Sequence, residues 1–237
     1  MIAVLSNMFN KEFEECTKIP SLSLNAFDKL PLPTSSHADM LLFLIDKTVF
    51  CYNDYYMINE DVFREVEKLG YEVIKIKKEC KGTYPEDIAL NVLLIGKRIF
   101  CNTKHTAKEI LDYASSHNYQ IVDVKQGYAS CSTLVINESL AITADAGMRK
   151  ALERKNIKVL QISDKGINLN GYNCGLIGGS AVTINKTVYF FGSIQKHSSC
   201  EKIKEFLYEN NYSYFEIGSK EVYDYGGVKI FLKRDDI

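Results

Sequence analysis

The sequence lacks the features that mark membrane, secreted and nucleic-acid-binding proteins. It contains no run of 18 apolar residues, and its start has no basic segment followed by a long apolar stretch. We therefore expect neither a membrane span nor a secretion signal. The formal net charge is only −1, with Lys and Arg spread along the chain, so no basic surface for nucleic acid or lipid is expected.

Paired cysteines are also missing. The seven cysteines form no C-x-x-C pair, which argues against a zinc site, and we expect no metal and no cofactor. Without a secretion signal, these cysteines are predicted to be reduced thiols in a cytoplasmic protein. Cys51 and Cys101 stand at the same place in a repeat described below, which predicts that both pack in the core.

What the sequence does contain is a repeated unit. Residues 131–162 read as strand, turn, strand, helix and strand: TLVI and LAIT flank a turn at 137–139, and IKVLQI returns after a helix. Asp145 is expected to cap that helix.

The same unit recurs three more times along the chain. LLFLI-DKT-VFCYN precedes a predicted helix over 61–69 and the strand YEVIKI; NVLLI-GKR-IFCNT precedes a helix over 107–116 and YQIVDV; SAVTI-NKT-VYFFG precedes a helix over 201–208 and YSYFEI. The turn residues Asp46, Gly96, Asn137 and Asn185 are spaced by 50, 41 and 48 residues. A fixed period of this kind predicts a repeat architecture.

A fifth unit is divided between the two ends of the chain. The last strand, GGVKIFL, reaches a fifth turn at Lys233, another 48 residues on, and the N-terminus supplies IAVLSN, a helix over 10–17 and SLSLNAF. We therefore predict one α/β domain over 1–237, with five ββαβ units in a ring that leaves no open sheet edge.

Polar residues cluster where the first strand of each unit is expected to begin. Counting back from each turn by odd steps selects residues on one face of the strand. If the five units surround one axis, this face forms the mouth of a central channel that binds a cationic or hydrogen-bond-rich small molecule. The predicted mouth contains His37, Asp39, Asp87, Asn91, Tyr128, Ser130, Ser132, Ser180 and Asp224. The alternative is that these are polar residues at strand starts that meet solvent.

Three residues form a candidate catalytic group. His37 and Asp39 have the types of a general base and its orienting carboxylate, and Cys131 is a candidate nucleophile. Cys131, however, lies an even number of residues before its turn, on the strand face shared with Met40. A regular strand would direct this face into the core. The glycine pairs 178–179 and 226–227 predict positive φ or a close backbone approach.

The repeat and three short motifs carry a resemblance to a known superfamily. Five strand–turn–strand–helix–strand units closed around an axis resemble the pentein, or five-bladed α/β-propeller, fold. HADM at 37–40, GYASC at 127–131 and the glycines of 171–179 resemble, more closely, a group of uncharacterised bacterial proteins of this fold. Its better-known members include arginine and agmatine deiminases, dimethylarginine hydrolases, glycine amidinotransferases and the non-enzymatic ribosome anti-association factors.

The resemblance implies two different functions. In the enzymes a glycine run in the last unit is followed by histidine and a cysteine nucleophile, whereas here Lys229 and Ile230 stand at those places. The first hypothesis is an enzyme of the hydrolase or amidinotransferase kind, in which Cys131, activated by His37, attacks a guanidino or amide compound held by Asp39, Asp87 or Asp224. The second is a non-catalytic pentein that binds a ligand or a protein. Neither the substrate nor the oligomeric state follows from the sequence.

Overall fold

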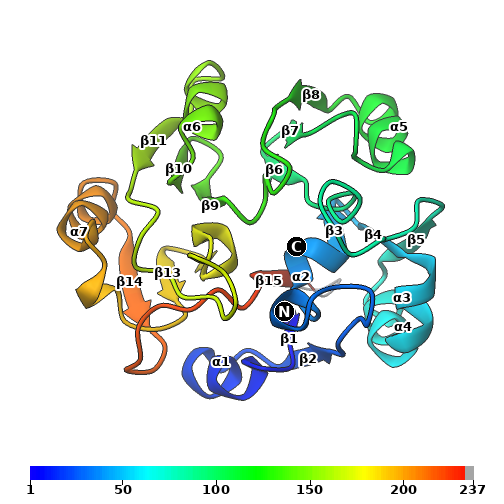
Figure 1. Ribbon diagram of the computed structural model, residues 1–237, viewed down its shortest axis with the longest axis horizontal. Coiled ribbons are helices and arrows are strands. Elements are labelled where there is room, and N and C mark those ends of the chain that lie inside the picture. Colours follow the sequence, from blue (N-terminus) through cyan, green and yellow to red (C-terminus); the bar gives the residue numbers. More distant parts are fainter. Residues whose placement is uncertain (233–237) are drawn as a thin grey trace.

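The computed structural model describes residues 1–232 of the chain. These residues form five three-stranded sheets, and Figure 1 shows them arranged around a common centre with the longer helices at the periphery. Within each sheet the first two strands are antiparallel, and the third is parallel to the second after a helical crossover. The predicted ββαβ unit is therefore confirmed.

The elements follow one another in the predicted order. The first full unit consists of β3 (Leu42–Ile45), β4 (Thr48–Tyr52), α3 (Asn53–Ile58), α4 (Glu60–Lys68) and β5 (Glu72–Ile76). The second has β6 (Leu93–Ile95), β7 (Arg98–Cys101), α5 (Lys108–Ser116) and β8 (Gln120–Asp123). The third has β9 (Thr133–Asn137), β10 (Leu140–Thr143), α6 (Ala146–Glu153) and β11 (Lys158–Gln161). The fourth has β12 (Ala181–Ile184), β13 (Thr187–Phe190), α7 (Cys200–Glu209) and β14 (Ser213–Glu216).

The fifth unit joins the two ends of the chain, as predicted. It contains β15 (Val228–Phe231), β1 (Ile2–Ser6), α1 (Asn10–Thr17) and β2 (Ser21–Leu24). β1 pairs antiparallel with β15 and parallel with β2. The fifth turn predicted at Lys233 lies outside the described residues.

Several short helices lie between these elements. The α-helix α2 (Ala38–Leu41) precedes β3, and 3₁₀ helices lie at Leu32–Thr34, Ile177–Gly179 and Ile194–Lys196. None of these four helices, nor α3, was expected from the sequence. Among the described residues, no helix is both long and apolar enough to cross a membrane.

The helices and turns form for the local reasons expected. The helices predicted over 61–69, 107–116 and 201–208 begin and end within one residue of α4, α5 and α7. The Asp145 carboxylate caps α6 by accepting the Met148 N–H at 2.6 Å. Asp46 (φ 49°) and Asn185 (φ 55°) adopt the left-handed backbone of tight hairpin turns, which Asp and Asn tolerate better than most residues.

A tyrosine connects each of three units to the unit before it. Tyr71, Tyr119 and Tyr212 each stand one residue ahead of the third strand of their unit. The Tyr119 hydroxyl donates to Asp46 Oδ1 at 2.6 Å, in the hairpin of the preceding unit. The hydroxyls of Tyr212 and Tyr71 accept from Asn137 Nδ2 at 2.8 Å and from the Leu232 N–H at 2.9 Å, in the equivalent places.

A lysine from the hairpin of the same unit covers each of these rings. The ammonium groups of Lys47, Lys97 and Lys186 lie 4.1, 4.1 and 4.4 Å from the ring centroids of the three tyrosines. Such cation–π contacts stabilise the ring in place. The third unit has Ile157 at the tyrosine position and lacks this contact.

Removal of one tyrosine hydroxyl should measurably lower the stability of the protein. We expect Tyr119→Phe to lower the free energy of unfolding by about 1 kcal/mol, because it loses a hydrogen bond to a partly exposed carboxylate but keeps the lysine contact. Urea unfolding followed by circular dichroism measures the change. Tyr208→Phe, at a side chain that is 84% exposed, is the control and should change it by less than about 0.5 kcal/mol. Equal effects of the two substitutions would contradict a role for the tyrosine in joining units.

Candidate functional site

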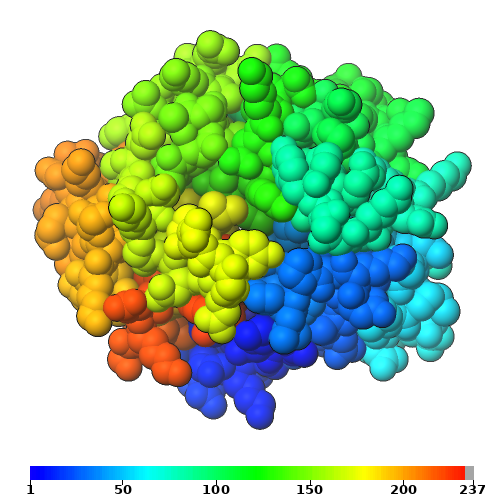
Figure 2. Space-filling model, viewed as in Figure 1, coloured from blue at the N-terminus to red at the C-terminus, as the bar shows by residue number. Residues whose placement is uncertain are grey.

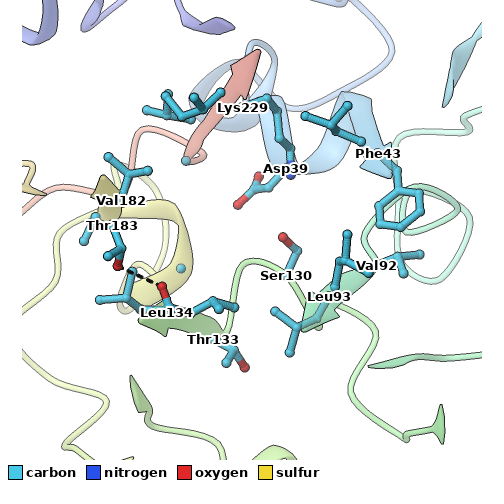
Figure 3. A pocket seen from close by; sticks show the side chains of 18 of the residues that line it. Asp39, Phe43, Val92, Leu93, Ser130, Thr133, Leu134, Val182, Thr183 and Lys229 are labelled. Atoms are coloured by element: carbon cyan, nitrogen blue, oxygen red, sulfur yellow. Dashed lines mark hydrogen bonds between the residues drawn. The ribbon is translucent and has the colours of Figure 1, made fainter. Parts of the chain in front are cut away.

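A cavity lies at the centre of the ring. It has a volume of about 360 Å³, and the first strand of every unit contributes to its wall. Figure 3 shows these side chains surrounding an open space, with the Asp39 carboxylate pointing into it. Residues from the five strands that line it include Phe43, Leu44, Leu93, Leu94, Leu134, Ile136, Val182, Thr183, Val228 and Ile230.

The two ends of the cavity differ in exposure. At one end lie Asp39, which is 2% exposed, and Ser130, both in the segments that precede the strands. Further along the strands, wall residues such as Leu44, Val182 and Ile230 are half-buried. In Figure 2 the segment around residues 165–180, in yellow, reaches the centre of this face of the molecule beside the N-terminal segment in blue. Asp39 is therefore among the most deeply buried residues of the wall, together with Phe43 and Val92.

Asp39 is a buried carboxylate that lies close to the Cys131 thiol but accepts no hydrogen bond of good geometry within residues 1–232. Its backbone N–H donates to the Gly226 carbonyl at 2.9 Å, which holds the first turn of α2 against the chain ahead of β15. Neither carboxylate oxygen has a hydrogen-bond partner within residues 1–232. Burial raises the pKa of Asp39; His37 opposes this shift, the Asp224 charge adds to it, and Lys229 opposes it. A ligand with N–H groups would satisfy this carboxylate.

Lys229 lines the cavity beside Asp39. It lies on β15, and Figure 3 shows its side chain at the Asp39 end of the cavity. Burial lowers the pKa of Lys229, while the negative charge of Asp39 acts in the opposite direction. In the described part of the chain, no carboxylate lies within 4.0 Å of its ammonium group. The sequence analysis did not include Lys229 in the site, although its place after the glycine pair could have suggested it.

His37 lies behind this end of the cavity, against Asp224. It is 3% exposed, and its Nδ1 is 3.8 Å from Asp224 Oδ1. Burial lowers the pKa of His37, although the Asp39 charge raises it. Gly226 has φ 80°, and a Cβ there would lie 2.2 Å from His37 Cβ. The prediction of positive φ and close approach at this glycine pair is confirmed.

Backbone N–H groups hold Asp224. Its carboxylate accepts from the Leu176 N–H at 2.8 Å and from the Gly226 N–H at 3.0 Å. Burial raises the pKa of Asp224 to about 6, while these two hydrogen bonds act to lower it. A Cβ on Gly179 would lie 2.0 Å from Asp224 Oδ1, so only glycine fits there. Gly179 thus packs against this carboxylate, whereas Gly178 packs against the backbone carbonyls of Ser130 and Cys131.

Asn91 fixes the turn that carries Cys131. Its Oδ1 accepts from the N–H groups of Ser130 and Cys131 at 2.8 and 3.3 Å, and its Nδ2 lies 2.8 Å from the Cys131 Sγ. The thiol is 4% exposed, does not line the cavity, and lies 3.9 Å from the Met40 sulfur. Burial, and then the charges of Asp39 and Asp224, raise its pKa well above the usual value. In these surroundings Cys131 is a thiol rather than a thiolate.

No hydrogen bond joins His37 to Cys131 among the described residues. The His37 ring contacts Asp224 instead, and the thiol contacts Asn91 and Met40. The structure therefore places the two members of the predicted base–nucleophile pair in different surroundings.

The other residues of the predicted mouth lie outside the cavity wall. Asp87 accepts a hydrogen bond from the Tyr128 hydroxyl at 2.8 Å, and burial raises the pKa of Asp87. The hydroxyls of Ser132 and Ser180 each donate to the backbone carbonyl three residues before, at 3.2 and 3.1 Å. Of the nine predicted residues, only Asp39 and Ser130 line the cavity.

The expectation that these residues lie on strands was wrong. His37 and Asp39 belong to the start of α2, Ser130 lies in a turn, and Ser180 follows a 3₁₀ helix. The first strands begin only at residues 42, 93, 133, 181 and 228. The residues of the predicted mouth precede these strands, so the alternation of side chains along a strand does not give their directions. No group of three or more His, Cys, Asp or Glu that could hold a metal ion is present within residues 1–232.

The chain resembles several solved enzyme structures of the pentein superfamily. An amidinotransferase of saxitoxin biosynthesis from Microseira wollei matches with a TM-score of 0.61 and 11% identity, over 96% of this chain and 79% of that one. Dimethylarginine dimethylaminohydrolase of Pseudomonas aeruginosa, in complex with citrulline, gives 0.57 and 9%, over 92% of each chain. Agmatine deiminase of C. jejuni gives 0.52 and 13%, over 91% and 75%.

At these identities the likeness establishes the pentein fold and no activity. No curated protein matches the sequence. A family model, described as "Family of unknown function (DUF6873)", matches residues 5–229. Since that match covers nearly the whole chain, the protein belongs to this family.

Proposed function

We propose that the protein binds a small molecule carrying a guanidinium or similar N–H cation in the central cavity, with Asp39 as its anchor. The observation that carries this proposal is the Asp39 carboxylate, which is buried, borders the cavity and has no hydrogen-bond partner among the described residues. A buried charged group without partners destabilises the fold by about 1–3 kcal/mol or more. A ligand that donates two N–H groups to it would recover that cost.

The charge balance at this end of the cavity favours a cation. When Asp39, Lys229 and Asp224, which lies behind the cavity wall, are all ionised, two carboxylates and one ammonium group leave one negative charge in excess around Asp39. His37 does not change this balance, because burial lowers its pKa and favours the neutral ring. One monovalent cation would neutralise the site.

The fold is compatible with this ligand class. Solved neighbours include a dimethylarginine dimethylaminohydrolase in complex with citrulline and an agmatine deiminase. We also infer that the five sheets act as the blades of an α/β-propeller, with the ligand on its axis. The cavity volume of about 360 Å³ lies at the lower end of the range for small-molecule sites.

The surroundings of Cys131 favour binding over covalent catalysis by this residue. A nucleophilic cysteine needs a neighbouring base or a lowered pKa. Here burial and the neighbouring Asp39 carboxylate raise the pKa of the thiol, and the sulfur contacts Asn91 and Met40. Of the two hypotheses from the sequence, we therefore favour the non-catalytic pentein.

Loss of the Asp39 charge should weaken ligand binding. We expect Asp39→Asn to reduce the affinity for agmatine at least tenfold in isothermal titration calorimetry, because a hydrogen bond to a charged group contributes about 1.5–3 kcal/mol. Asp87→Asn is the matched control, since Asp87 is a buried carboxylate outside the cavity wall. Equal affinities in the two variants, or no binding by the unmodified protein, would refute the proposal.

Binding should also depend on pH in one direction. Because burial raises the pKa of Asp39, its carboxylate takes up a proton at a higher pH than an exposed aspartate. The protonated group no longer attracts a cation, so agmatine affinity should fall as the pH is lowered and Asp39 takes up its proton. Asp39→Asn should give a shallower profile, in which the remaining pH dependence comes from Asp224, whose pKa burial raises to about 6. A profile that rises toward low pH would contradict this assignment.

Alkylation of the cysteines distinguishes the hypothesis of a binding protein from that of an enzyme. A chloroacetamidine reagent should modify exposed Cys16 at least tenfold faster than Cys131, because the latter is buried and its pKa is raised. Peptide mass spectrometry gives both rates. Selective labelling of Cys131 that arginine prevents would instead support the enzyme.

A further inference from the structure

The cavity contains one charged group that the proposed function does not use. Asp39 and Lys229 are the charged residues that line it in the described part of the chain, and both lie at the same end. Figure 3 shows the Lys229 side chain next to the Asp39 carboxylate. A guanidinium bound at Asp39 would therefore lie next to the ammonium group of Lys229, which is also positively charged.

Asp39 and Lys229 are close but do not form an ion pair. Each charge acts on the pKa of the other, so they share one electrostatic environment. Their nitrogen and oxygen atoms are nevertheless more than the 4.0 Å of an ion pair apart, and Asp39 keeps both oxygens free of hydrogen bonds. Opposite charges held apart in one cavity can each accept a group from a ligand that carries both signs.

The rest of the wall offers no partner for a third charge. The strands contribute mainly Phe, Leu, Ile and Val side chains. The Thr183 hydroxyl, one of the few polar groups, already donates to the Val135 carbonyl at 2.8 Å, as Figure 3 shows. A ligand that extends along the strands should therefore be mainly apolar beyond its head group, with the Thr133 hydroxyl, which has no hydrogen-bond partner among the described residues, as a further polar contact.

We propose that the natural ligand has a zwitterionic head group and an apolar body, the chemistry of an α-amino acid with a hydrophobic side chain. Its ammonium group binds Asp39, its carboxylate binds Lys229, and its side chain packs between the five strands. This inference rests on the proposed site at Asp39 but replaces an isolated cation by a zwitterion. It involves no covalent step.

Two matched sets of compounds test the head group. The first comprises L-leucine, 3-methylbutylamine and 4-methylpentanoate; the second comprises L-phenylalanine, 2-phenylethylamine and 3-phenylpropanoate. In each set the amine lacks the carboxylate and the acid lacks the ammonium group. By calorimetry at neutral pH with the full-length protein, at least one amino acid should bind tenfold or more tightly than both of its analogues.

Variants then assign each charge. Lys229→Met keeps the length of the side chain but removes its charge, and it should abolish the advantage of the amino acid over its amine. Asp39→Asn should abolish its advantage over its acid, and Lys229→Arg should retain most of the affinity. Circular dichroism and thermal unfolding verify that each variant is folded.

The possible outcomes separate this inference from the proposed function. If agmatine and the amines bind as tightly as the amino acids, the zwitterion is refuted and the cation site at Asp39 stands. If Lys229→Met leaves the preference unchanged, the role of Lys229 is refuted. If no compound binds, both proposals fail.

Discussion

The antiparallel pairing of β1 with β15 is the interaction on which the centre of the molecule depends. It connects residues 2–5 with residues 228–231, so that the two ends of the chain complete one sheet. This pairing carries Lys229 to the cavity, and the Asp39 N–H then bonds the Gly226 carbonyl just ahead of β15. The two charged residues of the cavity are thus brought together by closure of the ring, although 190 positions separate them in the sequence.

The buried end of the cavity is assembled from backbone as much as from side chains. Asp224 is held by two backbone N–H groups, and Gly226 and Gly179 allow the chain to pass within contact distance of His37 and Asp224. A side chain at either glycine would displace one of those two residues. The glycine pairs therefore contribute to the site by letting two loops approach a buried carboxylate, since hydrogen-bond donors must come close to keep such a charge in place.

The repeated ββαβ unit could be predicted from the sequence because short, local signals define it. Hairpin turns, apolar stripes and the Asp145 cap each depend on neighbouring residues, and the helices lie within one residue of their expected bounds. The site was less predictable, because its residues precede the strands. Asp39 lies in a helix and Ser130 in a turn, so strand alternation gave no guide to their directions. Lys229 does lie on a strand, and its place after the glycine pair was a local hint, but only tertiary structure places it beside Asp39.

The polar residues at the centre divide into two groups by their hydrogen bonds. Asn91, Ser132, Ser180 and Asp224 all bond to backbone or to a neighbouring side chain, so they hold the loops ahead of the strands in place. Asp39 has no such bond, and Lys229 forms no ion pair in the described chain, yet both border empty space. Because polar groups with satisfied bonds gain little from a ligand and unsatisfied ones gain much, the second group is where we propose that a ligand binds. At the centre of this fold, the groups that a ligand would meet unpaired are therefore a carboxylate and an ammonium group, whereas the Cys131 thiol lies outside the cavity wall with a raised pKa.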